Sequence, residues 1–222
     1  MVLEIISVYF YRNKRIIFDN FNLKLKKSQI MILIGKNGIG KTTLFDLIVG
    51  ILEPKNGIIK INEIPIEDLY SDKRFLFTYL PHKDSLKENL TVRENLEIWA
   101  NLSENENNFS TINSSLKYFN IYDLSNNFIG NLSQGQRKKV SLSKLLLTKT
   151  NLWLLDEPFN GLDKSSISQT IKLLENHAKN GGSVLISNHI NVGIKNSQKV
   201  FLKRKENKDK KIITLKTWDD IK

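Results

Sequence analysis

Short apolar runs separated by polar turns dominate the N-terminal part of the chain. The continuous run Ile30–Ile34 predicts a buried strand, and apolar residues at helical spacing over 43–49 predict the first turns of a helix shortly behind it. Residues 53–57, Glu-Pro-Lys-Asn-Gly, are typical of a turn. Further strands are expected at 3–9, 21–27, 58–61 and 74–79.

The pattern changes after residue 84. Thr91 and Glu94 have the spacing of a capping box that starts a helix. A polar loop is expected at 103–108, and helical spacing resumes at 112–119, so we expect a mostly helical lobe at about 84–147. The apolar face of the first helix in this lobe is expected to consist of Leu96, Ile98, Trp99 and Leu102.

An α/β pattern returns after this lobe. A strand is expected at 152–155, a helix at 165–179 and another strand at 183–187. The chain has no internal repeat and no long linker. We therefore expect residues 1–222 to form a single α/β domain with an inserted helical lobe.

The composition limits the classes of protein that fit this pattern. The chain has 222 residues, of which 40% are hydrophobic, an ordinary value for a globular α/β domain. The absence of cysteine excludes disulfides, a thiol nucleophile and a Cys-ligated metal site. No apolar run has the length of a membrane-spanning helix, and the N-terminus lacks the basic region of a secretory signal. A cytoplasmic protein, or one in an equivalent compartment, is therefore expected.

The formal net charge of +11 has two interpretations. A basic surface attracts nucleic acid or the anionic face of a membrane. Alternatively, Lys is simply abundant along with Asn and Ile, as in proteins from AT-rich genomes. The lysines are scattered, and the densest run, at 203–211, is typical of a solvated hairpin tip. We favour the second interpretation and expect no nucleic-acid partner.

The most specific motif starts where the first buried strand ends. Residues 35–42, Gly-Lys-Asn-Gly-Ile-Gly-Lys-Thr, match the phosphate-binding pattern G-x-x-x-x-G-K-[ST] between a predicted strand and a predicted helix. The glycines let backbone N–H groups converge on a β-phosphate at the helix N-terminus. Lys41 can then reach the β- and γ-phosphates, and the Thr42 hydroxyl can bind Mg²⁺. The expected nucleoside-triphosphate site consists of Gly35, Lys36, Asn37, Gly38, Ile39, Gly40, Lys41, Thr42 and Thr43.

A pair of carboxylates follows the strand expected at 152–155. Asp156 and Glu157 end an apolar run, an arrangement that is common on its own but that suits the other half of a nucleotide site. In this interpretation Asp156 holds Mg²⁺ through a water molecule, and Glu157 polarises the attacking water.

A third motif lies in the expected helical lobe. Ser133 and Gly135 precede a basic segment and an apolar helix, and a Ser and a Gly at a helix N-terminus form an anion site suited to a γ-phosphate. The lobe lies away from Lys41 in any single-domain arrangement, so this site makes sense if it caps the nucleotide of a second copy. The motif consists of Leu132, Ser133, Gln134, Gly135 and Gln136.

These motifs together resemble those of the nucleotide-binding subunit of an ATP-binding-cassette transporter, over essentially the whole chain. Residues 132–136 resemble the family's LSGGQ signature, with Gln134 in place of a glycine. Residues 160–163, Asn-Gly-Leu-Asp, resemble the D-loop through which two subunits sense each other, with Asp163 as its acidic residue. His189, which follows the strand expected at 183–187, resembles the switch histidine that contacts the γ-phosphate.

The resemblance implies a P-loop fold with a β-rich N-terminal part, a RecA-like core and a helical lobe. It also implies an ATPase that uses ATP and Mg²⁺, with Lys41, Glu157 and His189 as catalytic residues and with Thr42 and Asp156 at the metal.

Two positions of the family pattern leave alternatives. The family stacks adenine on an aromatic residue of the N-terminal strands, where Tyr9, Phe10 and Tyr11 are all available. We favour Tyr11, although core or strand packing accounts for any one of these rings equally well. The family's usual Gln after the strand at 74–79 joins the Mg²⁺ site and the contact with membrane subunits, and here that place is taken by His82.

Residues 79–99 resemble the ATPase subunit of the haem exporter in the cytochrome c maturation system. That resemblance implies a homodimer in the ATP state, bound over residues 82–99 by integral membrane subunits on separate chains and serving a haem chaperone indirectly. The implied location is the cytoplasmic face of the inner cell membrane, or the matrix side of the mitochondrial inner membrane. Another small exporter ATPase and a soluble ATPase for cofactor assembly remain alternatives. The shared features are His82, Leu86-Lys87, Leu90-Thr91, Glu94-Asn95-Leu96 and Trp99.

Overall fold

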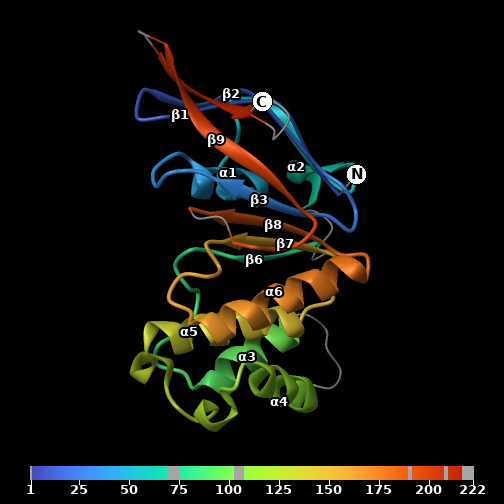
Figure 1. The fold of residues 1–222 in the computed structure, drawn as a ribbon, viewed down its shortest axis with the longest axis vertical. Coiled ribbons are helices and arrows are strands. Elements are labelled where there is room, and N and C mark those ends of the chain that lie inside the picture. Colours follow the sequence, from blue (N-terminus) through green and yellow to red (C-terminus); the bar gives the residue numbers. More distant parts are fainter. Residues whose placement is uncertain (1, 70–75, 103–107, 190–191, 208–209, 217–222) are drawn as a thin grey trace.

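A small antiparallel sheet forms the N-terminal side of the molecule (Figure 1). The computed structural model describes residues 2–69, 76–102, 108–189, 192–207 and 210–216. The strand order in this sheet is β2-β1-β4-β5, and every neighbouring pair is antiparallel. Its strands are β1 (Leu3–Arg12), β2 (Arg15–Leu25), β4 (Asn56–Ile61) and β5 (Ile64–Pro65).

A larger sheet of order β10-β9-β3-β8-β7-β6 carries the functional loops. Strand β3 pairs in parallel with β8 and β9, and β7 pairs in parallel with β6 and β8. Parallel strands end at the same edge of a sheet, so the loops that follow β3, β6, β7 and β8 gather there. The strands are β3 (Ile30–Ile34), β6 (Phe77–Leu80), β7 (Leu152–Asp156), β8 (Ser183–Asn188), β9 (Ser197–Asn207) and β10 (Lys210–Lys216).

Helices cover both faces of the larger sheet (Figure 1). Helix α1 lies between the two sheets, whereas α6 and the helical lobe cover the opposite face. The helices are α1 (Lys41–Ile48), α2 (Ile66–Leu69), α3 (Val92–Leu102), α4 (Asn108–Tyr118), α5 (Gln134–Ser143) and α6 (Lys164–Lys179), with 3₁₀ turns at Tyr122–Leu124, Ile129–Asn131 and Lys144–Leu146.

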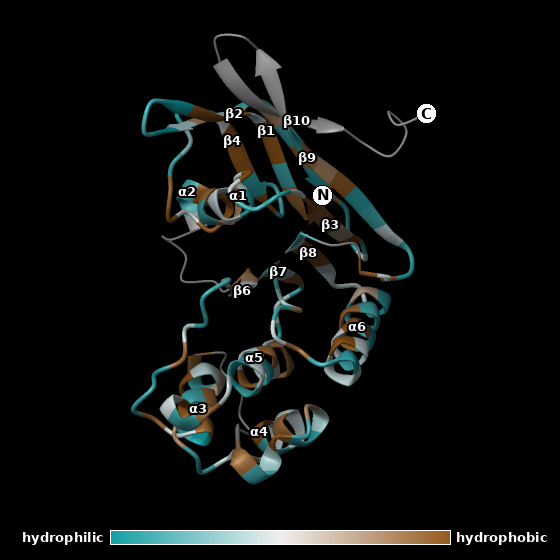
Figure 2. Ribbon diagram, turned by 60° about the vertical axis from the view of Figure 1, so that its left-hand side comes forward, coloured by the Kyte–Doolittle hydropathy of each residue, from teal (hydrophilic) through white to brown (hydrophobic). Residues whose placement is uncertain are grey.

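Strand β3 explains why the molecule has two cores. Its alternate residues Ile30 and Ile32 pack with the lobe and α6, while Met31 and Leu33 pack between the sheets with α1. Figure 2 shows hydrophobic segments on strands of both sheets and also on the helices. Each fully buried aliphatic side chain of this kind stabilises the fold by about 1.5–3 kcal/mol, which fixes β3 and the loop that follows it.

Most expected elements are confirmed, but the first two strands are longer than expected. Asn13 and Lys14 have φ angles of 50° and 60° and form a tight hairpin turn, so β1 and β2 extend up to it. The hairpin expected around 203–211 is confirmed by the pairing of β9 with β10. Parts of the expected strand at 74–79 and of the loop at 103–108 lie outside the described residues.

Helix α3 begins where it was expected to begin, but the prediction of its apolar face was wrong in part. Thr91 N donates to Glu94 Oε2 at 2.7 Å and Glu94 N donates to Thr91 Oγ1 at 3.2 Å, which confirms the capping box. Leu96 is fully buried, but Ile98 and Leu102 are 38% and 50% exposed. Trp99 is partly buried and packs against the core, as expected. The fully buried apolar residues follow the i, i+4, i+8 spacing of a helix and are Val92, Leu96 and Ala100.

A ring stack between α6 and β7 yields a test of the packing. His177 stacks on Trp153 with 3.5 Å between ring centroids, and a Cβ added at Gly182 would lie 2.2 Å from His177 Nε2. We expect Gly182→Ala to lower the melting temperature by about 4 °C or more, because the imidazole must leave the stack. Thermal melts followed by circular dichroism measure this change. In a His177→Ala background the same substitution should lower the melting temperature much less. An equal decrease in both backgrounds would contradict the contact between Gly182 and the His177 ring.

Candidate active site

The phosphate loop joins β3 to α1 at the edge where the parallel strands end. Gly38 and Gly40 have φ angles of 71° and 115°, a left-handed backbone that residues with a Cβ rarely adopt. Gly40 occupies the N-cap position of α1 and provides no side-chain cap. The first N–H groups of a helix have no partner within the helix, so the loop offers donors suited to a phosphate.

Lys41 is the first residue of α1 and is only 5% exposed. Its Nζ donates to Gly35 O at 2.8 Å and to Lys36 O at 3.3 Å, and lies 3.5 Å from Glu157 Oε1. The ammonium group is therefore held over the phosphate loop and beside the expected catalytic carboxylate.

Thr42 and Asp156 meet across the site. Thr42 Oγ1 donates to Asp156 Oδ2 at 2.7 Å, and the Ser187 hydroxyl donates to Asp156 Oδ1. Within the described residues no group of three or more His, Cys, Asp or Glu side chains could hold a metal. One carboxylate and one hydroxyl nevertheless fit Mg²⁺, which takes few protein oxygens and completes its shell with phosphate oxygens and water.

Glu157 turns back toward Lys41 because of an unusual backbone. Its φ angle is 50°, and its N–H is held by Ser187, at 3.2 Å from the carbonyl oxygen and 3.1 Å from the hydroxyl. Such a conformation costs about 1–3 kcal/mol and is characteristic of functional sites. The side chain is buried, and its Oε2 accepts from Asn160 Nδ2 at 2.6 Å and lies 3.3 Å from His82 Nδ1. The residue expected in place of the family's Gln thus lies against the expected general base.

Three titratable side chains near this carboxylate pair have shifted pKa values. Burial raises the pKa of Tyr79 and of Asp46, and the Asp156 carboxylate acts in the same direction on both. Burial lowers the pKa of Lys138 in α5, although Asp156 acts in the opposite direction. All three shifts favour the uncharged form of the side chain, as expected for groups that are partly withdrawn from water.

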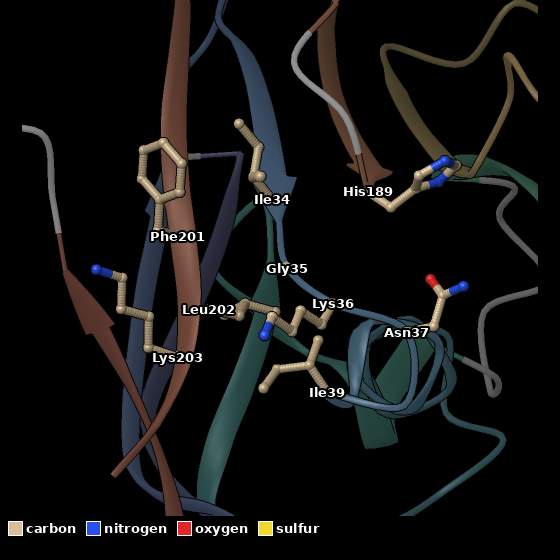
Figure 3. Close-up of a pocket in the computed structure, with 9 residues that line it drawn as sticks. All are labelled: Ile34, Gly35, Lys36, Asn37, Ile39, His189, Phe201, Leu202 and Lys203. Atoms are coloured by element: carbon tan, nitrogen blue, oxygen red, sulfur yellow. The ribbon is translucent and has the colours of Figure 1, made fainter.

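His189 directly follows β8, the strand that lies between β3 and β7, and it lines a cavity of about 630 Å³. The cavity lies between the loop and β9, and Figure 3 shows His189 on the same side as Asn37, with Phe201 and Lys203 on the other. His189 is exposed, and its N–H donates to Asn188 Oδ1 at 3.0 Å. Its ring is therefore accessible next to the loop.

Ser133 caps α5 and is not brought to the phosphate loop of its own chain. Gln136 N donates to Ser133 Oγ at 3.3 Å, and Ser133 N donates to Gln136 Oε1 at 2.9 Å. Figures 1 and 2 both place α5 and α1 on opposite sides of the larger sheet. Ser133 and Gln134 are exposed, so this helix N-terminus is open to a partner molecule.

Asp163 has a structural part in this chain as the N-cap of α6. It accepts from Ser165 Oγ at 2.6 Å and from Ser166 N at 2.7 Å, and Lys139 Nζ lies 3.2 Å away. These bonds, the one from Ser165 first, lower the pKa of Asp163. Its expected contact with nucleotide stays a prediction.

Tyr11 stands 46% exposed near the β1–β2 turn, with Lys55 Nζ 5.8 Å from its ring centroid. An exposed ring on this edge suits base stacking, and the choice of Tyr11 over Tyr9 and Phe10 stays a prediction. Phe10 is only 6% exposed and belongs to the core between the sheets, which leaves it little surface for a ligand.

Ser187 and Asn160 donate hydrogen bonds to the two carboxylates, contacts that the motifs did not predict: Asn160 was expected only as part of the D-loop. Ser187 stands opposite Asp156 in the pairing of β7 with β8, a register that sequence does not reveal. Asn160 lies three residues after Glu157, and that short spacing was the available signal.

The fold and this cluster define a P-loop nucleoside-triphosphate-binding protein. The family model described as "ABC transporter" matches residues 18–160, over half of the chain, and the chain belongs to that family. It is accordingly an ATP-binding, ATP-hydrolysing subunit whose hydrolysis is coupled to transport and which works with membrane subunits. Within the described ranges no helix combines the length and apolarity needed to span a membrane.

Named relatives and solved structures agree with this family. The chain is 40% identical over 193 residues, 86% of each chain, to the "Cytochrome c biogenesis ATP-binding export protein CcmA" of Reclinomonas americana. It is 36% identical to the protein of the same name from Rickettsia bellii over 182 residues, 82% of this chain and 90% of the relative.

Among solved structures, an "ATP binding subunit of ABC transporter" is 26% identical, with a TM-score of 0.85 over 100% of this chain and 92% of that chain. A "Putative ABC transporter (ATP-binding protein)" from Pyrococcus furiosus is also 26% identical, with a TM-score of 0.77 over 90% and 97%.

The position of Lys41 yields a binding test. We expect Lys41→Ala to weaken ATP binding by at least about 100-fold, because the cation over the loop is lost while the loop backbone remains. Titration with a fluorescent ATP analogue measures the affinity, and circular dichroism checks the fold. Lys172→Ala, an exposed change on α6, is the control and should bind normally. Unchanged affinity in Lys41→Ala would contradict the assignment of the loop.

Proposed function

We propose that this chain is the ATPase motor subunit of a membrane exporter that acts in c-type cytochrome biogenesis, most like the haem exporter. The observation that carries the hydrolytic part is the contact of Glu157 with Lys41 and His82 beside the Thr42–Asp156 pair. The names of the relatives support the biological part. In this proposal residues 1–222 act as one domain.

The chemistry follows from the positions of the side chains. The loop N–H groups and Lys41 bind the β- and γ-phosphates, and Thr42 and Asp156 hold Mg²⁺. Mg²⁺, when bound, neutralises charge that develops on the phosphate oxygens. Glu157 orients the attacking water and accepts its proton, and His189, which follows the neighbouring strand β8, contacts the γ-phosphate.

Two copies complete the site in this proposal. Ser133 and the N-terminus of α5 are exposed and lie across the sheet from the loop of the same chain, so an ATP bound at Lys41 is capped by the signature of a second copy. The positive helix end and the capping hydroxyl suit the γ-phosphate, whose charge they help to neutralise.

The segment after His82 is tied to the helical lobe, which supports a role in force transmission. Asp84 accepts from Arg137 Nε at 3.0 Å, and Glu88 accepts from Arg137 Nη1 at 2.8 Å. Asn95 of α3 accepts from Lys87 N at 2.8 Å and donates to Lys87 O at 3.0 Å. A change at Glu157 that moves His82 therefore reaches both α3 and α5.

Integral membrane subunits on separate chains bind over residues 82–99 in this proposal. Ile98 and Leu102 lie one turn apart on α3 and are 38% and 50% exposed, so this helix presents apolar side chains to a partner at the end of the segment. The subunit then lies peripherally on the cytoplasmic face of the inner membrane, or on the matrix side in a mitochondrion. It serves a haem chaperone indirectly, through the conformational change of those partners.

The two-copy arrangement can be tested with the catalytic carboxylate. We expect Glu157→Gln to bind ATP but to hydrolyse it at least about 100-fold more slowly, because the base is lost. It should accumulate as an ATP-bound dimer in size-exclusion chromatography with light scattering. Adding Ser133→Arg should abolish the dimer, whereas Ser168→Arg on the exposed face of α6 should not. A strictly monomeric Glu157→Gln protein with bound ATP would contradict the arrangement.

The biological role can be tested in cells. A strain that carries only Glu157→Gln should keep its membrane subunits assembled, because docking does not need hydrolysis, but should lack mature c-type cytochromes. Haem staining of membrane proteins measures holocytochrome c, and b-type cytochromes are the internal control. Normal holocytochrome c in a deletion strain would instead favour another exporter or a soluble cofactor-assembly ATPase.

A further inference from the structure

The turn after β7 contains a neutral side chain that binds the expected general base. Asn160 Nδ2 donates to Glu157 Oε2 at 2.6 Å, shorter than the distances of Glu157 to His82 and to Lys41. The amide must present its N–H₂ side, because its oxygen would face a carboxylate oxygen and be repelled. We propose that Asn160 is a positioning residue for hydrolysis, which fixes the rotamer of the Glu157 carboxylate; this rests on the proposed role of Glu157.

The other contacts of the carboxylate cannot perform this role alone. Lys41 is the group that binds the phosphates of ATP. Once nucleotide is bound, its attraction is divided between the phosphates and Glu157. The side chain of His82 is 56% exposed, so water competes with Glu157 for its ring nitrogen. Asn160 is neutral, so its hydrogen bond to Glu157 is not divided in this way between the carboxylate and the phosphates.

The local backbone keeps Asn160 within reach of Glu157. Asn160 N donates to Glu157 O at 3.4 Å, and Leu162 N donates to Phe159 O at 3.3 Å, so the turn is closed by its own hydrogen bonds. A general base must keep its carboxylate within hydrogen-bond reach of the water in a narrow range of angles. A donor on the same short turn provides that restraint at small entropic cost.

The turn also rests on the helix that carries the signature. A Cβ added at Gly135 would lie 2.8 Å from Gly161 O, and Lys139 pairs with Asp163 at 3.2 Å. A shift of α5 relative to the larger sheet therefore moves the turn that holds Asn160. The orientation of Glu157 is thereby coupled to the position of α5 in the same copy.

Asn160→Asp tests the contact with almost no change of shape. It replaces the donor by a second carboxylate against Glu157. We expect kcat for ATP to fall by about 10–100-fold in Asn160→Asp and in Asn160→Ala, with KM for ATP within about twofold of wild type, because Asn160 acts on the base and not on bound ATP. Asn176→Asp, the same change on an exposed position of α6, is the control and should keep normal kinetics.

A double-mutant cycle separates positioning from general stability. Asn160→Asp should lower the melting temperature by about 4 °C in the wild-type background, where two carboxylates meet. In a Glu157→Gln background the loss should disappear, because the carboxylate introduced at position 160 accepts a hydrogen bond from the amide introduced at position 157. Equal losses in both backgrounds, or an unchanged kcat in an active protein, would overturn the proposal. A wild-type protein without ATPase activity would instead reject the proposed function, while the thermal cycle still reports on the contact.

Discussion

The arrangement of this molecule depends on the parallel alignment of β3, β7 and β8. Because these strands run in the same direction, they end at the same edge of the sheet. The phosphate loop, the carboxylate pair and Ser187 therefore lie together at that edge. Asp156 is then bonded from two sides, by Thr42 at the start of α1 and by Ser187 in the neighbouring strand. A buried carboxylate is costly unless it is hydrogen-bonded, so these two donors stabilise this edge of the sheet and fix the orientation of Asp156.

The elements with a strong hydrophobic pattern were predictable from the sequence. The runs at β3, β7 and β8 are buried on both faces and read as continuous apolar segments, and the phosphate loop has a pattern of its own. The length of β1 and β2 was not predictable in this way, because it depends on two non-glycine residues, Asn13 and Lys14, in left-handed conformations. The prediction of the apolar face of α3 failed in part because Ile98 and Leu102 fit helical spacing but are exposed to solvent.

The candidate site residues could be predicted from the sequence, but the contacts between them could not. Motifs identified Lys41, Asp156 and Glu157, and position suggested His82, but only the folded chain brings His82 to within 3.3 Å of Glu157. The bonds from Asn160 and Ser187 depend on a turn and on a strand register that local sequence does not encode. The signature at Ser133 and the loop residues Lys36, Asn37 and Gly38 are all exposed, but they lie on opposite sides of the larger sheet. This separation is the basis for the proposal that a second copy joins them.

The central claim is that ATP joins the phosphate loop of one copy to the signature of another. The chain has no cysteine, so single cysteines can be introduced without background reaction. Asn37→Cys and Gln134→Cys proteins, both in a Glu157→Gln background, can be mixed and treated with a short thiol cross-linker. We expect a cross-linked dimer that contains one of each variant and that forms with ATP but not with ADP. Cross-linking that is absent with ATP, or equally strong without nucleotide, would contradict it.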